Sequence, residues 1–141
     1  MHMPNRQFRA FSAKSARSAL AVSVALLLGM GPSLAWAEIT PLVWSEAGVF
    51  EAKLPVAAGK FAEVCGPVAE GQRIAWQFES DQALDFNIHF HLGKQVSYPE
   101  RQKQVQRAQG ELTVSAPQDH CWMWSNKGSS AGTLTLRLKR L

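Results

Sequence analysis

The sequence lacks the common signatures of enzymes and of membrane-spanning proteins. Its 141 residues contain no Gly-x-Ser-x-Gly elbow, no phosphate-binding glycine loop and no His-Glu-x-x-His motif. The apolar run at residues 19–30 is about a dozen residues long, whereas a transmembrane helix needs about 20. We therefore expect a protein that is not an enzyme and that has no membrane-spanning segment in its mature form.

Acidic residues are also absent from the N-terminal segment, which has the pattern of an export signal. Arg6, Arg9, Lys14 and Arg17 precede the apolar run, and residues 35–37, Ala-Trp-Ala, fit the small-x-small rule for signal peptidase. We predict that residues 1–37 are a cleaved signal peptide and that residues 38–141 form a single domain. The protein is expected in the periplasm or outside the cell.

Removing this leader also removes the net charge of the chain. The full sequence has 15 Lys and Arg against 11 Asp and Glu, and four of the basic residues lie in the leader. The remaining domain is formally neutral, so the basic character of the whole chain says nothing about its partners. The domain has no stripe of basic residues, so nucleic-acid binding is not expected.

Cysteine is scarce, and both residues, Cys65 and Cys121, fall in the predicted exported domain. We expect them to form a disulfide, because oxidising compartments let disulfides persist. Such a bond would stabilise the fold by roughly 3 to 4 kcal/mol on the chain-entropy estimate. The alternative is a free or metal-binding thiol at Cys121.

Apolar residues alternate with polar ones along most of the domain, and helical spacing is not sustained over a dozen residues. This pattern predicts an all-β domain, an antiparallel β-sandwich of jelly-roll-like type with about eight strands and one disulfide. A small closed barrel is the alternative. Residues 95–110 are polar throughout and are predicted to form either a weak hairpin or a mobile loop.

Several strands show which side chains should be buried. The apolar residues predicted to point inward are Ile74, Trp76 and Phe78, then Leu84, Phe86, Ile88, Phe90 and Leu92, and later Leu112, Val114, Leu134, Leu136 and Leu138.

Two histidines on the polar side of one strand raise the question of a metal site. His89 and His91 are two residues apart, so their side chains point the same way about 7 Å apart and could reach one ion. Copper or zinc would need further ligands, for which His120 and Met123 are the candidates. The alternative is that this side of the strand is simply the solvent-exposed face of the sheet, formed by Asp85, Asn87, His89 and His91.

The segment HCWMWSN, residues 120–126, poses a second choice. Strand alternation places His120, Trp122 and Trp124 on one face and Cys121 and Met123 on the other. If the tryptophans face outward, they form an aromatic binding surface, with Asn87 as a further candidate. If they fill the core, which we favour slightly, the disulfide lies near the surface or a bulge breaks the alternation.

From about residue 61 to 141 the order of these signals resembles a GOLD domain, the β-sandwich of p24 cargo receptors and some lipid-transfer proteins. The resemblance rests on CGPVAEGQRIAWQF, LDFNI, GELTV, HCWMWSN and the leucine-rich last strand. It implies a disulfide between Cys65 and Cys121 and a non-enzymatic module that binds a protein or lipid. The coiled coil and transmembrane helix of p24 proteins are absent from this sequence, so a role in vesicle traffic is not implied.

The sequence thus predicts an exported, non-enzymatic binding module for an unknown protein or lipid partner. The alternative is a periplasmic copper- or zinc-binding protein.

Overall fold

The structure is a computed structural model that describes residues 38–141, and the predicted signal peptide lies outside the described residues. Seven strands make up this part of the chain. They are β1 (Glu38–Pro41), β2 (Val49–Val56), β3 (Phe61–Pro67), β4 (Arg73–Leu92), β5 (Gln95–Thr113), β6 (Asp119–Ser125) and β7 (Gly132–Arg140). Among the described residues, no helix is long and apolar enough to cross a membrane.

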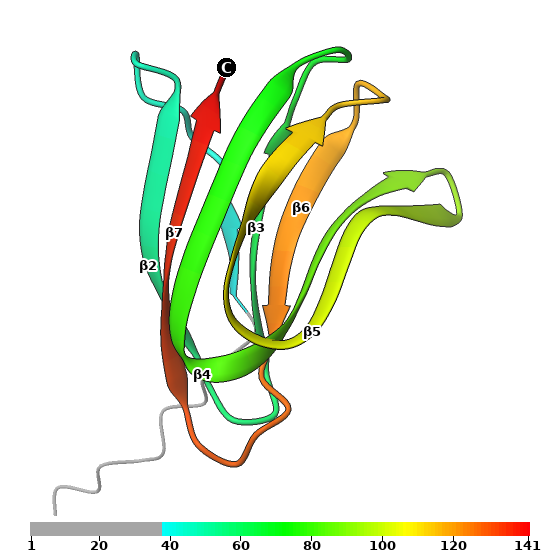
Figure 1. Ribbon diagram of the computed structural model, residues 1–141. Coiled ribbons are helices and arrows are strands. Elements are labelled where there is room, and N and C mark those ends of the chain that lie inside the picture. Colours follow the sequence, from blue (N-terminus) through cyan, green and yellow to red (C-terminus); the bar gives the residue numbers. More distant parts are fainter. Residues whose placement is uncertain (1–37) are drawn as a thin grey trace, which may run out of the picture. The chain divides into compact units, whose positions relative to one another are not determined.

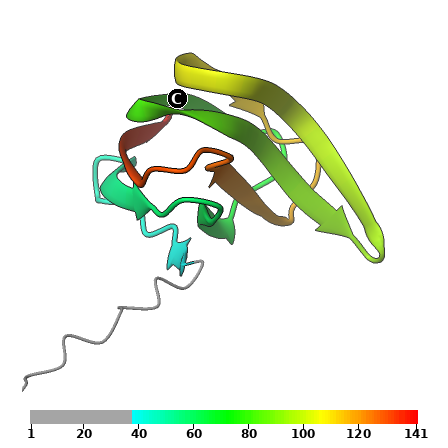
Figure 2. The same cartoon turned by 90° about the horizontal axis from the view of Figure 1, so that it is seen from below.

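The long strand β4 belongs to two layers at once. Its first half pairs with β7, from Ile74 to Ser80, and β7 in turn pairs with β2. Its second half pairs with β6, from Asp85 to Phe90, and β6 continues to β3 and β1. Strand β5 follows β4 through both layers, so the curled β4–β5 ribbon connects them (Figures 1 and 2). The result is the sandwich-like all-β fold that the alternation predicts.

A sharp bend in β4 separates the two layers. The register with β5 shifts between Glu79 and Leu84, so the intervening residues have no regular partner on β5. Such a bulge bends a strand and increases its twist. On β5, Gln104 has a positive φ of 51°, and the carboxylate of Asp85 accepts hydrogen bonds from its backbone and side-chain nitrogens at 3.1 and 2.9 Å. Asp85 thus holds the backbone of the neighbouring strand in its left-handed conformation.

The core lies between the layers and is built from aromatic side chains of β4 and β6. The Phe86 ring lies 5.0 Å from that of Trp76, 4.8 Å from that of Phe78 and 5.4 Å from that of Trp124, measured between centroids. Trp122 and Trp124 are both fully buried. The alternative in which the tryptophans fill the core is therefore the observed one, and the predicted outward Trp122/Trp124 surface is wrong.

Most of the predicted inward faces are confirmed. Every residue of that set is buried except Leu92, which is 47% exposed. Ala116, which the same alternation also predicts to point inward after Val114, is only half-buried. Leu92 lies beyond Phe90, the last β4 residue that pairs with β6, so no second layer covers it.

The strand count and the polar segment needed correction. Two strands expected separately, residues 72–80 and 84–92, are the two halves of β4, so seven strands replace the predicted number of about eight. The polar residues 95–110 belong to β5 and are not a loop. Among the described strands β5 pairs with β4 alone, so it needs little apolar surface. Its sequence therefore lacks the alternation of apolar and polar residues by which the other strands were predicted. One pair, β1 with β3, is parallel.

Candidate functional site

The two histidines of β4 lie on the outer face of the layer formed by β3, β6 and the second half of β4. We call this surface the histidine face; its members are Glu63, Cys65, Asn87, His89, His91, Cys121 and Met123. The rings of His89 and His91 are 5.6 Å apart between centroids and nearly perpendicular, at 76°. Their shared orientation follows from the alternation of side chains along the strand.

His89 is not part of a solvent-exposed surface, because its side chain is buried and the residue is only 8% exposed. A bulge in β5 places two residues, Tyr98 and Pro99, opposite His89, since Ile88 pairs with Glu100 and Phe90 with Ser97. The Tyr98 ring lies 5.7 Å from the His89 ring between centroids. The alternative of a solvent-exposed face is therefore wrong for His89, whereas His91 is exposed.

Both ring nitrogens of His89 have polar partners. Nδ1 lies 2.8 Å from Oδ1 of Asn87, to which it donates, and Nε2 lies 3.2 Å from Oε1 of Glu63. Because Nδ1 carries the proton, Nε2 presents a lone pair to the Glu63 carboxyl group. Glu63 is itself only 8% exposed.

Burial shifts the ionisation of both partners toward the neutral form. The pKa of Glu63 is raised because the carboxylate loses water, an effect that nearby His91 opposes. The pKa of His89 is lowered, first by burial and then by the charges of His91 and His120. Both shifts favour the uncharged forms, and the 3.2 Å between Nε2 of His89 and Oε1 of Glu63 calls for one proton between the two atoms.

The predicted disulfide is present beside this pair. Cys65 and Cys121 are direct neighbours on β3 and β6, with Cα atoms 4.2 Å apart, and are bonded through sulfur. Cys121 is also the direct neighbour of His89 across the β4–β6 pairing. Ligand atoms of Glu63, His89 and Cys121 all lie within 4.8 Å of one another. In the disulfide, however, Cys121 has no thiolate to offer a metal.

Of the other two predicted metal ligands, His120 lies away from the two β4 histidines and Met123 lies on their face. His120 points into the core on the opposite side of β6, where it is 1% exposed and stacks on Phe90 at 4.5 Å between centroids. Its Nδ1 lies 3.0 Å from the carbonyl oxygen of Gln118. Met123 is on the histidine face and half-buried, opposite Asn87. The proposed inclusion of His120 is therefore wrong, because the sheet separates its ring from those of His89 and His91.

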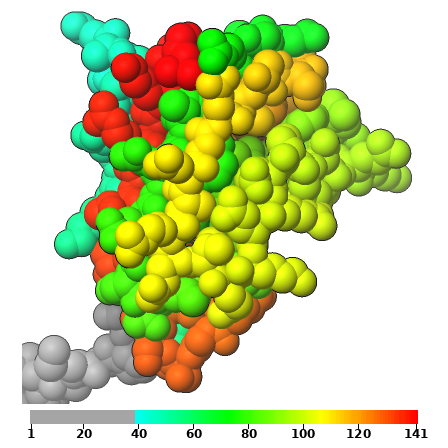
Figure 3. Space-filling model, in the orientation of Figure 1, coloured from blue at the N-terminus to red at the C-terminus, as the bar shows by residue number. Residues whose placement is uncertain are grey.

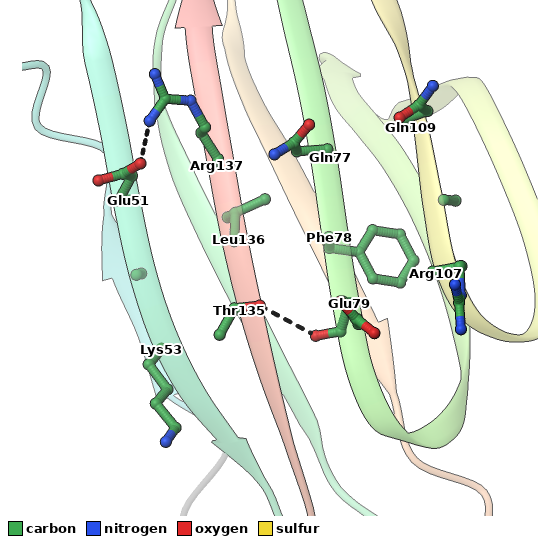
Figure 4. Close-up of a pocket in the computed structure, with 12 residues that line it drawn as sticks. Glu51, Lys53, Gln77, Phe78, Glu79, Arg107, Gln109, Thr135, Leu136 and Arg137 are labelled. Atoms are coloured by element: carbon green, nitrogen blue, oxygen red, sulfur yellow. Dashed lines mark hydrogen bonds and ion pairs between the residues drawn. The ribbon is translucent and has the colours of Figure 1, made fainter.

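A second surface, which sequence reasoning missed, lies on the outer face of the other layer. An open groove of about 880 Å³ crosses β2, β7, β4 and β5. Figure 4 shows its polar lining, where Arg137 pairs with Glu51 and the hydroxyl of Thr135 donates to the carbonyl oxygen of Glu79 at 3.5 Å. Each strand contributes alternate polar residues, so the alternation signals this face, but only the strand order shows that they form one groove.

The end of the β4–β5 ribbon forms a third surface. Residues 91–98, here called the hairpin tip, extend past the last β6 pairing and stand out from the body of the domain (Figures 1 and 3). The tip exposes Leu92, Val96 and Tyr98 at 47%, 39% and 41%. The Arg101 guanidinium lies 3.4 Å from the Tyr98 ring centroid, a cation–π contact that holds this ring in place.

Comparison with solved structures finds the same fold in three proteins of low sequence identity. PliG of Aeromonas hydrophila, a periplasmic inhibitor of g-type lysozyme, matches with a TM-score of 0.59 and 14% identity over 75% of this chain and 98% of its own. PliG of Salmonella Typhimurium, with the same described role, matches with a TM-score of 0.53 and 5% identity over 74% and 99%. The pre-peptidase C-terminal domain of Bacillus anthracis collagenase matches with a TM-score of 0.58 and 14% identity over 73% and 96%.

No protein-family model and no curated protein sequence matches the chain. The resemblance to the GOLD domain stays a prediction, since none of these structures is named as one. What these three structures share with this chain is the fold, and the class that they define is a sandwich-like all-β domain.

Proposed function

We propose that this chain is an exported, non-enzymatic module that binds another protein through its hairpin tip. The observation that carries the proposal is the exposure of Leu92 and Val96 on a part of the ribbon that no second layer covers. Apolar side chains at a protruding tip stabilise a complex when a partner removes them from water, at roughly 25 cal/mol per Å². The disulfide and the predicted leader support export.

The charge of the ribbon defines the kind of partner. Residues 91–107 carry four basic residues and one acidic residue, within a domain that is formally neutral. The basic residues are Lys94, Arg101, Lys103 and Arg107. An acidic recess on a protein surface is therefore the complementary partner, and salt should slow the association.

The fold supports g-type lysozyme as the first partner to test. This domain covers almost the whole length of two proteins described as inhibitors of that enzyme. At 14% and 5% identity their fold is shared, so the partner itself is a proposal.

The test measures binding and inhibition of a g-type lysozyme by protein expressed from the full-length sequence and purified after export. We expect a saturable complex and a matching loss of lytic activity. A Leu92→Ser, Val96→Ser double variant should bind at least about tenfold more weakly, which corresponds to roughly 1.4 kcal/mol.

Val43→Ser is the matched control, because Val43 is 69% exposed and lies away from the ribbon. It should change neither affinity nor inhibition. Equal binding by both variants would remove the hairpin tip from the proposal, and no complex with g-type lysozyme would remove that partner. Binding to neutral phospholipid vesicles, lost in the double variant, would instead favour the lipid alternative.

A further inference from the structure

The pair of Glu63 and His89 has an arrangement that metal sites share. Hydrogen bonding of Nδ1 to Asn87 at 2.8 Å fixes the ring and directs the Nε2 lone pair at the Glu63 carboxyl group. Metal-binding histidines are usually held in this way, by a hydrogen bond from the nitrogen that does not bind the ion. Asn87 therefore serves as a positioning residue for Nε2 of His89.

The distances suit a tetrahedral ion. Zinc lies about 2.0–2.1 Å from nitrogen or oxygen ligands and about 2.3 Å from sulfur, so tetrahedral geometry places N and O about 3.3 Å apart and two sulfurs about 3.8 Å apart. The observed Nε2–Oε1 distance is 3.2 Å, and Sγ of Cys121 lies within 4.8 Å of both atoms. Nε2 and Oε1 are thus at the required separation already, and Sγ of Cys121 must move closer to them for a tetrahedral ion to bind all three.

The fourth ligand is Cys65. It faces Cys121 directly in the β3–β6 register and lies two residues from Glu63 on the same side of β3. Three adjacent strands therefore bring two cysteines, a histidine and a carboxylate to one nearly buried spot. Thiolate, imidazole and carboxylate are each known ligands of zinc.

We propose that the Cys65–Cys121 disulfide occupies a preformed zinc site, and that its reduction by a dithiol allows one Zn²⁺ to bind Cys65, Cys121, His89 and Glu63. In the reduction, the sulfur–sulfur bond breaks, two electrons and two protons pass to the cysteines, and the dithiol becomes a disulfide. Zinc then displaces both thiol protons and the proton that Glu63 and His89 share. Disulfide and metal are mutually exclusive, so the cross-linked chain binds no zinc at this site.

The main test compares oxidised and reduced protein, expressed from the full-length sequence and purified. Reduction uses a phosphine reagent, which is removed under anaerobic conditions before Zn²⁺ is titrated against a chromophoric chelator. We expect one equivalent to bind to the reduced form, at least about 100-fold more tightly than to the oxidised form. Co²⁺ in place of zinc should give the absorption of a tetrahedral ion with thiolate ligands.

Variants separate the four-ligand site from simple thiol binding. His89→Ala and Glu63→Gln in the reduced protein should each weaken zinc binding at least about tenfold. Glu70→Gln is the matched control for Glu63→Gln, because Glu70 is an exposed carboxylate in the loop between β3 and β4, and the zinc affinity of this variant should match wild type. Equal affinity of the His89→Ala variant, or equal binding by oxidised and reduced protein, would overturn the proposal.

A second measurement covers the case in which the reduced chain unfolds without metal. Zinc should then restore the near-ultraviolet circular dichroism of the fold and should slow reoxidation by glutathione disulfide at least about tenfold. Both effects should be lost in His89→Ala and kept in Glu70→Gln. Failure of zinc to restore the fold of the reduced wild type would also overturn the proposal, and none of these results depends on a lysozyme partner.

Discussion

Removal of the Cys65–Cys121 bond should cost this domain about 4 kcal/mol of stability. The two residues are 56 apart in the sequence, and the chain-entropy model gives about 4 kcal/mol for a closed loop of that length at 25 °C. A domain of this size has an unfolding free energy of about 5–15 kcal/mol. The bond is thus a large share of the total, and a Cys65→Ala, Cys121→Ala variant should be much closer to its unfolding threshold.

The assay is equilibrium unfolding in urea followed by tryptophan fluorescence, which reports on the buried Trp122 and Trp124. With a slope of about 2 kcal/mol per molar urea, the midpoint should fall by about 2 M. Reduced wild-type protein without metal is the control and should unfold near the same midpoint as the variant. A loss of less than about 1 kcal/mol in both would refute the reasoning, because the unfolded chain would then gain little freedom from losing the bond.

Three further changes test the core, the β4–β5 pairing and the buried histidines. Trp122→Ala should lower the unfolding free energy by about 3–5 kcal/mol in urea unfolding, because the side chain is fully buried, whereas an outward tryptophan would lose little. Gly110→Ala should cost about 1–3 kcal/mol in the same assay, because an added Cβ would lie 2.5 Å from the Trp76 ring; a neutral result would show that the ribbon yields there. Stability should fall as the pH drops below about 6.5, because burial lowers the pKa of His89 and of His120 while both histidines take up protons in the unfolded chain. The raised pKa of Glu63 opposes this loss of stability at lower pH. Unfolding curves at several pH values should show that the unfolding free energy depends less on pH in His120→Phe, a variant that keeps a ring stacked on Phe90. An unchanged pH dependence would exclude His120 as a cause.

Strand faces could be predicted wherever one side of a strand is buried. Ile74, Trp76 and Phe78 alternate with polar residues because a sheet with one dry face requires it, and the structure buries all three. Strand β5 lacks this requirement at its open edge, so its polar sequence was consistent with a loop as well. Leu92 was misplaced for a related reason, since alternation does not show where the covering layer ends.

The candidate site could be predicted only in part. The spacing of His89 and His91 placed them on one face, but nothing local to β4 indicated that Glu63 would lie 3.2 Å from His89. That contact depends on the order β3, β6, β4, which joins segments far apart in the sequence. The burial of His89 depends on a bulge that brings Tyr98 over it, and bulges leave little trace in a polar sequence.

The pairing of β2 with β7 has a consequence for how the chain acquires its structure. Residues 49–56, near the start of the described domain, find their hydrogen-bonding partners in residues 132–139, at its very end. Loop closure over such a distance is slow, and no shorter N-terminal fragment contains both strands. In a chain that emerges from a ribosome or a translocation pore, β2 therefore stays without its partner until residues 132–139 are free.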